Sequence, residues 1–168
     1  MKYNKGMSLL EVILVIAIMA ILVGTAVSGI GYIRFADTKK CAYDINSMLA
    51  KTRTEAMSRS SKPYFYIYKY NNNYYMLATA ASPSSLVLDG SATKIGNSSM
   101  EIIVKDEAGN ERSITGNDVS SNAVKIGFVK STGAFETSYF YDEILIQGKT
   151  DYTIKLAKNT GKHYVAKD

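Results

Sequence analysis

The longest apolar stretch of the chain opens with Lys5-Gly6-Met7-Ser8-Leu9-Leu10-Glu11, and residues 12–33 that follow carry no charged side chain. These 22 uncharged residues would be long enough as a helix to cross about 30 Å of hydrocarbon. Glu11 is the exception, because a carboxylate at the centre of a membrane helix costs roughly 2.5 to 3.5 kcal/mol. The stretch therefore predicts a membrane-spanning helix whose one acidic residue needs a partner.

Residues Gly6 to Glu11 resemble the class III signal of the type IV pilin and type II secretion pseudopilin superfamily. The resemblance implies that a membrane prepilin peptidase removes residues 1–6 as a leader peptide by cutting after Gly6, and then N-methylates Met7. It also implies that Glu11, the fifth residue after the cut, is the hallmark glutamate of the superfamily. Met7 departs from the phenylalanine that is usual at the new N-terminus.

Two interpretations of Glu11 remain open. A new amine at Met7 would be cationic and would lie about one helical turn, roughly 6 Å, from Glu11 of the same subunit, near a helix N-terminus that favours an anion. The resemblance implies that Glu11 of one subunit meets the Met7 amine of a neighbour, so that assembly pairs the two charges in lipid. In the alternative interpretation, the carboxylate of Glu11 reaches the membrane interface near the helix end.

Composition limits the rest of the chain to a single small domain. Of the 168 residues, about 110 are left for this domain, which is enough to bury a core. Without Lys2 and Lys5 of the leader, 18 basic residues stand against 15 acidic ones, a balance of +3, and no run of like charges indicates a nucleic-acid-binding arm. The single cysteine, Cys41, excludes a disulfide within this sequence. We expect Cys41 to be a buried or contact residue, with an intermolecular bridge as the alternative.

Ordinary targeting signals explain the apolar stretch less well. A cleaved secretory signal has an apolar core of about 7 to 15 residues, although Ala26-Val27-Ser28 weakly resembles its cut site. Basic residues flank both ends of the stretch, so the positive-inside rule does not fix its orientation. An N-terminus on the cytoplasmic side and a C-terminal domain outside are what the resemblance implies.

Three glycines, Gly24, Gly29 and Gly31, cluster late in residues 7–33, the transmembrane and polymerisation half of the expected helix. Glycine costs a helix interior about 1 kcal/mol relative to alanine, so this part of the helix is predicted to bend or melt most easily. Small residues also let helices approach closely in lipid. In a filament both interpretations could hold.

Residues 34–61 are predicted to continue the helix as an amphipathic half. Small and apolar residues recur at intervals of three or four with charged residues on the other faces. This stripe consists of Phe35, Ala42, Ile45, Leu49, Thr52 and Ala56. Pro63 disfavours helix at Lys62, so a helix from Ser8 to about Ser60 would be on the order of 80 Å long. Its outer half requires a domain to pack against.

Residues 62–168 read as a β-rich globular domain, so the predicted fold class is α+β, a long helix packed on an antiparallel sheet. Residues 64–70 and 74–78 flank Asn71-Asn72-Asn73 as a hairpin. Further strands are predicted at 100–105, 112–115, 124–129, 143–147, 152–157 and 164–165, with turns at 107–110, 131–133 and 159–161. Residues 82–85 are expected to form a loop, 86–88 at most a short strand, and the polar residues 113–122 a mobile surface loop.

A second set of features lies beyond the apolar stretch. It consists of Thr52-Arg53-Thr54-Glu55-Ala56-Met57 in the helix, Ile126-Gly127-Phe128 followed by Gly133, and Gly161 before the last strand. In this order the features are similar to the H-type minor pseudopilins and their type IV pilus counterparts. This resemblance implies a minor subunit.

Few residues could serve catalysis or bind a metal. His163 and Cys41 are over a hundred residues apart, and a zinc site needs more His or Cys than the sequence has. The adjacent carboxylates Asp106-Glu107 and Asp142-Glu143 would point to opposite faces of a strand, which indicates solvated turn charges rather than an acid–base pair. We therefore expect a protein that is not an enzyme, with no catalytic residue, cofactor or metal.

The thirteen tyrosines raise the question of nucleic-acid binding. Four of them share one face of the first predicted strand: Tyr64, Tyr66, Tyr68 and Tyr70. With lysines such as Lys62 and Lys69 they could stack on single-stranded DNA. Tyrosine alternation is also the usual composition of a half-buried sheet face, and arginine is scarce. Packing or subunit contacts are the favoured interpretation, and DNA binding is the alternative.

These features predict a structural subunit, a prepilin or pseudopilin. It would be cut after Gly6, held as a single-pass protein in the cytoplasmic membrane, and polymerised through its N-terminal helix into an extracellular type IV pilus (fimbrium) or a periplasmic or cell-wall pseudopilus of type II protein secretion. Its partners would be other pilin subunits, the prepilin peptidase and an inner-membrane assembly platform. Two alternatives remain: a competence pseudopilin that binds DNA during uptake, and a single-span anchored binding protein that does not polymerise.

Overall fold

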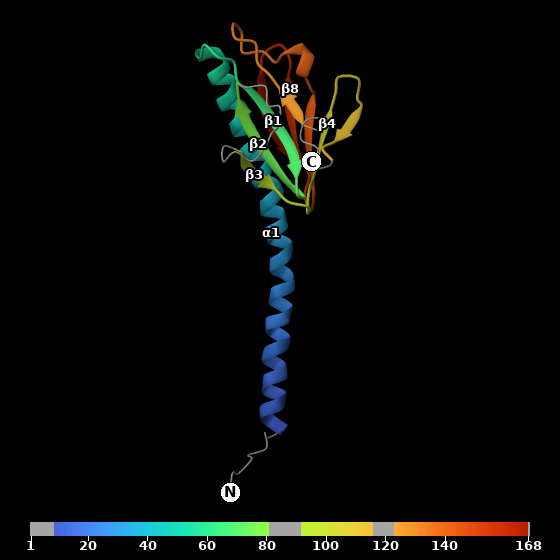
Figure 1. The fold of residues 1–168 in the computed structure, drawn as a ribbon. Coiled ribbons are helices and arrows are strands. Elements are labelled where there is room, and N and C mark those ends of the chain that lie inside the picture. Colours follow the sequence, from blue (N-terminus) through green and yellow to red (C-terminus); the bar gives the residue numbers. More distant parts are fainter. Residues whose placement is uncertain (1–8, 81–91, 116–122, 168) are drawn as a thin grey trace.

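A computed structural model describes residues 9–80, 92–115 and 123–167, with the backbone alone for residues 22–36. One helix, α1 (Leu9–Ser58), dominates the molecule, and its 50 residues make it about 75 Å long. Figure 1 shows that the C-terminal part of α1 packs against a β-rich domain, while the N-terminal part extends away from it. The predicted α+β class and the long helix are therefore confirmed.

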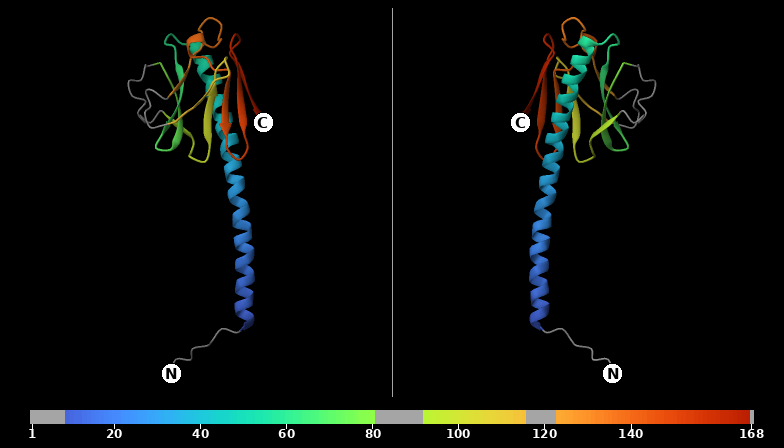
Figure 2. Two further views of the ribbon diagram at one scale, coloured as in Figure 1. Left: turned by 90° about the vertical axis from the view of Figure 1, so that its right-hand side faces the viewer. Right: turned by 90° about the vertical axis from the view of Figure 1, so that its left-hand side faces the viewer.

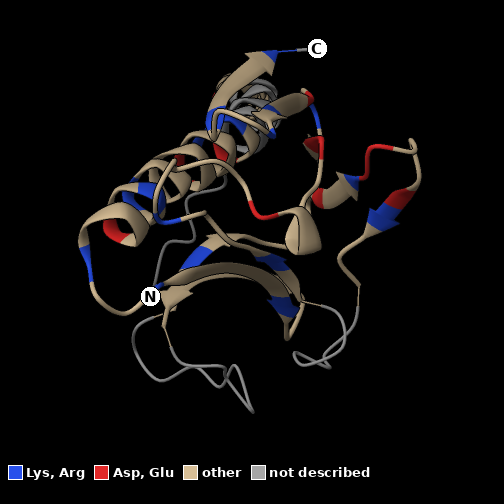
Figure 3. Cartoon of the chain, turned by 90° about the horizontal axis from the view of Figure 1, so that it is seen from above, with Lys and Arg blue, Asp and Glu red and all other residues tan. Residues whose placement is uncertain are grey.

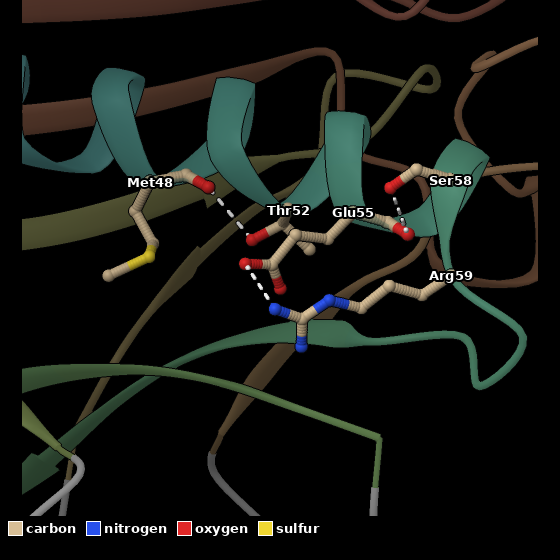
Figure 4. A network of polar contacts seen from close by, with 5 residues as sticks. All are labelled: Met48, Thr52, Glu55, Ser58 and Arg59. Carbon is tan, nitrogen blue, oxygen red and sulfur yellow. Dashed lines mark hydrogen bonds and ion pairs between the residues drawn. The ribbon is translucent and has the colours of Figure 1, made fainter.

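The amphipathic half of α1 buries the predicted stripe. Its buried residues are Thr38, Cys41, Ala42, Ile45, Leu49, Thr52 and Ala56. Phe35, the first residue of the predicted stripe, is among the residues for which only the backbone is described. The Thr52 hydroxyl can be buried because it donates a hydrogen bond of 2.8 Å to the Met48 carbonyl one turn earlier (Figure 4). Near the helix end, Arg59 forms an exposed ion pair with Glu55 at 3.5 Å, also drawn in Figure 4. The helix ends at Ser58, close to the boundary that Pro63 predicts.

Nine strands form two antiparallel sheets within the described residues, where the sequence analysis expected one. The first sheet has the order β3-β2-β1-β6 and the second the order β5-β4-β7-β8-β9. The first consists of β1 (Tyr64–Tyr70), β2 (Asn73–Thr79), β3 (Thr93–Gly96) and β6 (Val124–Ile126). The second consists of β4 (Glu101–Lys105), β5 (Glu111–Ser113), β7 (Glu143–Gln147), β8 (Tyr152–Ala157) and β9 (Lys162–Lys167). α1 contacts strands of both sheets (Figure 2).

One core joins the helix to both sheets. Ile45 and Leu49 of α1, Phe65 and Ile67 of β1, and Ile144 of β7 are all completely buried in this cluster. The opposite face of β1 carries a smaller cluster around Tyr66, Tyr68 and Leu77. The predicted separation of tyrosines from Phe65 and Ile67 is therefore confirmed, and both faces of β1 are packed.

Several element boundaries differ from the prediction. Asn71 and Asn72 alone form the hairpin turn, both with positive φ, and Asn73 pairs with Tyr70 in the strands. β3 and a short 3-10 helix, η1 (Thr137–Tyr139), were not predicted. Ile114 belongs to the core, because its side chain is buried and its N–H donates to the Ile102 carbonyl. Residues 82–88 and 116–122, predicted as loops and a short strand, lie outside the described residues.

Arg53 fastens the end of α1 to two turns of the domain. Its Nε donates to the Gly133 carbonyl at 2.8 Å, and its Nη2 donates to the Thr160 carbonyl at 2.9 Å. Gly161 and Gly133 both have positive φ, and a Cβ on Gly161 would overlap the Gly133 carbonyl oxygen. The two turns can therefore meet beneath Arg53 only because residue 161 has no side chain.

Replacing Gly161 with alanine should lower the free energy of unfolding by about 3 kcal/mol, because strain at positive φ adds to overlap with backbone. The matched control is Gly109→Ala: Gly109 also has positive φ, but a Cβ there would meet only the Lys105 side chain at 3.9 Å. That change should cost about 1 kcal/mol. Chemical denaturation of both variants in detergent measures the difference, and equal losses would contradict the steric explanation.

Candidate functional site

The N-terminal part of α1 exposes a continuous set of large apolar side chains. In the described segment Leu9–Ile21 these are Leu9, Leu10, Val12, Ile13, Leu14, Val15, Ile16, Ile18, Met19 and Ile21. Leu9 is 80% exposed and Ile21 is 66% exposed. Burial of one such side chain stabilises a structure by about 1.5 to 3 kcal/mol, and soluble monomers rarely leave so large an apolar surface uncovered. This surface of α1 is therefore built to be covered by something other than its own domain.

Glu11 lies in the first turn of α1 and is exposed. The helix brings its carboxylate to the end where the macrodipole is positive, which favours an anion. Its neighbours in the same turn, Leu10 and Val12, are large apolar residues. Gly6 and Met7, the predicted cleavage and methylation residues, lie outside the described residues. A charged group thus stands within the apolar surface.

The predicted flexible glycines, Gly24, Gly29 and Gly31, all lie within α1, and the backbone there is assigned as helix. Their effect on bending stays a prediction. In the described part of the chain, no helical segment combines the length and the apolar character that crossing a membrane requires.

The tyrosine-rich face of the domain is occupied by internal contacts. The side chains of Tyr66 and Tyr68 are only 6% and 1% exposed, so their ring faces are not open to a stacking base. Lys125 lies between two rings, with its Nζ 3.8 Å from the centroid of Tyr64 and 4.1 Å from that of Tyr139. These contacts support the packing interpretation of the tyrosines.

Lys62 joins the same cluster through a charge pair. Its ammonium is ion-paired with Glu136 and lies 5.4 Å from the Tyr64 ring centroid. Burial lowers the pKa of Lys62, and the nearby positive charge of Lys125 lowers it further. The cluster therefore ties the start of β1 to the residues around η1.

Cys41 and His163, the two residues considered for catalysis, are in contact with other parts of the domain. Burial raises the pKa of the Cys41 thiol to about 12, with a further contribution from Asp44, so the thiol is protonated at neutral pH. Burial lowers the pKa of His163, although hydrogen bonding to the Gly161 carbonyl opposes this. Among the described residues, no group of three His, Cys, Asp or Glu side chains could hold a metal ion.

The adjacent carboxylates serve turns and surface ion pairs. The side-chain amide of Asn110 donates to Asp106 Oδ2, and the backbone N–H groups of Asn110 and Ala108 donate to Oδ1; these hydrogen bonds lower the pKa of Asp106. Glu107 pairs with Lys158 at 2.6 Å. Glu143 pairs with Lys155 at 3.5 Å. Asp106 and Glu107 agree with the prediction of turn charges, whereas Glu143 is the first residue of β7, where the prediction was wrong.

Two hollows lie at the end of the domain where α1 joins it. Neither was predicted from the sequence. A hollow of about 230 Å³ lies between α1 and β3 and is lined by Asp37, Lys40, Lys94, Ile95, Gly96 and Asn97. A wider groove of about 520 Å³ is lined in part by Lys69, Tyr74, Ser98, Ser99, Glu101 and Gln147. The lining residues come from separate segments, so no local motif marks either site.

Comparison with known proteins identifies only the start of the chain. Residues 1–27 match the family described as the prokaryotic N-terminal methylation motif. Searches of curated proteins and of solved structures gave no match. The matched segment includes Gly6, Met7 and Glu11 and continues into the exposed apolar part of α1. The chain therefore carries a class III prepilin signal, consistent with the type IV pilin and pseudopilin superfamily.

Proposed function

We propose that this protein is a prepilin or pseudopilin, a structural subunit that is cut after Gly6 and assembles through α1 into a type IV pilus or a type II secretion pseudopilus. The observation that carries the proposal is the methylation motif at residues 1–27, which runs directly into a helix with an uncovered apolar surface. The other half of that helix is fixed in the domain core. Such a molecule has one end that needs apolar partners and one end that is packed within its own domain.

In the proposed mechanism, residues 12–33 first lie in the cytoplasmic membrane, with the N-terminus inside and the domain outside. During assembly the apolar surface of α1 exchanges lipid for the helices of neighbouring subunits. Lipid and helix surfaces are similarly apolar, so this exchange gains little from the hydrophobic effect alone. A charge pair between Glu11 and the methylated Met7 amine of a neighbour would favour one relative orientation of the two subunits and set their axial register.

The proposal includes a structural rather than catalytic role, because Cys41 is buried in the core and His163 lies in β9 with its ring against Phe135. A minor subunit is favoured, as the order of helix, turns and last strand resembles that subgroup. DNA uptake is the weaker alternative, since Tyr66 and Tyr68 are buried. An anchored binding protein would differ by failing to self-associate through α1.

Intact-mass and N-terminal analysis of the protein from its own membrane tests the proposal. We expect a chain that begins at N-methylated Met7 and lacks residues 1–6. The control is the same protein produced in cells without a prepilin peptidase, where the leader should remain. A native chain that keeps its leader in the presence of the peptidase would overturn the proposal.

A further inference from the structure

The end of the domain nearest the N-terminal part of α1, here called the base, is formed by residues of α1 and by three turns. At this end Gly148 packs so closely on Thr38 of α1 that a Cβ on Gly148 would have no room. The hollow of about 230 Å³ joins Lys40 of α1 to Lys94 of β3. The turns at the base are 71–72, 97–99 and 148–151. Figure 1 shows the free part of α1 leaving the domain at this end.

Lysines gather at the base. They are Lys39, Lys40, Lys69, Lys94 and Lys149. Three carboxylates share this end, and two of them are engaged locally: Asp151 accepts a hydrogen bond of 2.9 Å from the Gly148 N–H, and Glu101 accepts one of 2.6 Å from the Ser113 hydroxyl. The third, Asp37, lines the smaller hollow with Lys40 and Lys94. Among the described residues, cations therefore outnumber anions at the base.

The ion pairs of the domain lie elsewhere. Across the described residues they join Arg59 to Glu55, Lys62 to Glu136, Lys155 to Glu143 and Lys158 to Glu107. None of these pairs includes a lysine of the base. The strands of the first sheet carry lysines and no acidic residue (Figure 3). The charge of the base is thus not neutralised by salt bridges among the described residues.

The two hollows have linings suited to an anionic headgroup. The smaller one is lined by Lys40 and Lys94 together with Gly96 and Asn97, and also by Asp37. The larger one is lined by Lys69, Ser98 and Ser99, and also by Glu101. Ammonium and hydroxyl groups are common donors to phosphate oxygens. Basic residues within about a Debye length of an anionic membrane surface are attracted to it by about 1 kcal/mol each.

We propose that the base of the domain binds the headgroups of anionic phospholipids, with Lys40 and Lys94 as the main contacts. This inference rests on the proposed function, because it requires that residues 12–33 lie in the membrane. Lys39 and Lys40 follow Ile33 by six and seven residues, about 9 to 10 Å along a helix axis. This separation is about one Debye length at 0.1 M ionic strength. The domain would then lie against the membrane surface until assembly moves the subunit out of the membrane.

Hydrogen–deuterium exchange of the full chain in lipid nanodiscs tests the inference. One set of discs contains phosphatidylcholine alone, and the other contains equal parts of phosphatidylcholine and phosphatidylglycerol. We expect the amides of residues 97–99 and 148–151 to exchange more slowly in the anionic discs, by about fivefold for each lysine that contacts a lipid headgroup. Amides of β4 in the core should exchange equally in both, which verifies the fold.

Lys40→Glu combined with Lys94→Glu should abolish the difference between the two lipids. The matched control is Lys130→Glu, because Lys130 is exposed next to the turn that Arg53 holds, at the opposite end of the domain; this variant should keep the full difference. Equal exchange in both discs would overturn the lipid-binding inference and leave the proposed function standing. The same slowing by inorganic phosphate added to neutral discs would also overturn it, because a free phosphate would then be sufficient. A chain that does not enter the discs would overturn the membrane span and with it the proposed function.

Discussion

Replacing Glu11 with alanine is expected to lower incorporation into filaments by about a hundredfold while leaving insertion and cleavage intact. In the proposed filament, the variant would leave the Met7 amine of the next subunit in an apolar environment without its carboxylate. Removal of one member of a buried ion pair costs about 3 to 5 kcal/mol, largely because the remaining charge is uncompensated. Assembly from the membrane has no comparable hydrophobic gain to offset this cost.

The measurement is the fraction of processed subunit found in sheared or extracted filaments, compared with the fraction left in the membrane. Glu11→Gln keeps the size of the side chain and removes its charge, so it should show a similar loss. Glu55→Gln is the matched control, because Glu55 lies on the same helix in a surface ion pair with the exposed Arg59 that contributes at most about 1 kcal/mol. Normal filament yield from Glu11→Ala would contradict the pairing mechanism.

Local sequence signals predicted the elements of this fold well. The apolar stripe of residues 34–61 marked the buried face of α1, since a helix repeats its faces every three to four residues. The hairpin of β1 and β2 followed from alternating tyrosines and from asparagines that tolerate positive φ at Asn71 and Asn72. Turns were also predicted at 131–133 and 159–161, and the glycine that ends each segment, Gly133 and Gly161, has positive φ.

The arrangement of those elements was not predictable by the same means. Two sheets form because β1 pairs with β6 and β4 pairs with β7, across long intervening segments, and such pairings leave no local pattern. β3 has only four residues with two of them exposed, so its alternation is too short to detect. The contacts of Arg53 span 80 and 107 residues, and the hollows at the base combine α1, β3 and several turns.

The same difference between local and long-range signals applies to the candidate site. Gly6, Met7 and Glu11 lie in one short segment, so a prepilin signal could be predicted from the sequence alone, and the family match at residues 1–27 covers that segment. The lysines of the base are scattered from Lys39 to Lys149, and only the folded domain brings them to one end. Functions carried by short linear motifs are therefore visible before the fold is known, whereas surface functions require it.

Replacing Gly6 with leucine should produce the second large effect, an uncut precursor that keeps residues 1–6. A peptidase must bring its catalytic groups close to the backbone at the cut, and a glycine there offers no Cβ to obstruct the approach. Intact mass and immunoblotting of membranes measure the ratio of precursor to processed chain, and we expect almost no processed chain.

Gly24→Leu is the matched control for Gly6→Leu, because it makes the same chemical change within α1, far from the cut, and should be processed normally. The precursor of Gly6→Leu should also be absent from filaments, because the Met7 nitrogen of an uncut chain is a neutral peptide amide and cannot form the charge pair with Glu11. A processed chain of mature length from this variant would show that the cut lies elsewhere. Uncut protein in filaments would show instead that assembly does not depend on the new N-terminus, and the role assigned to Glu11 would then fail even if cleavage occurs as proposed.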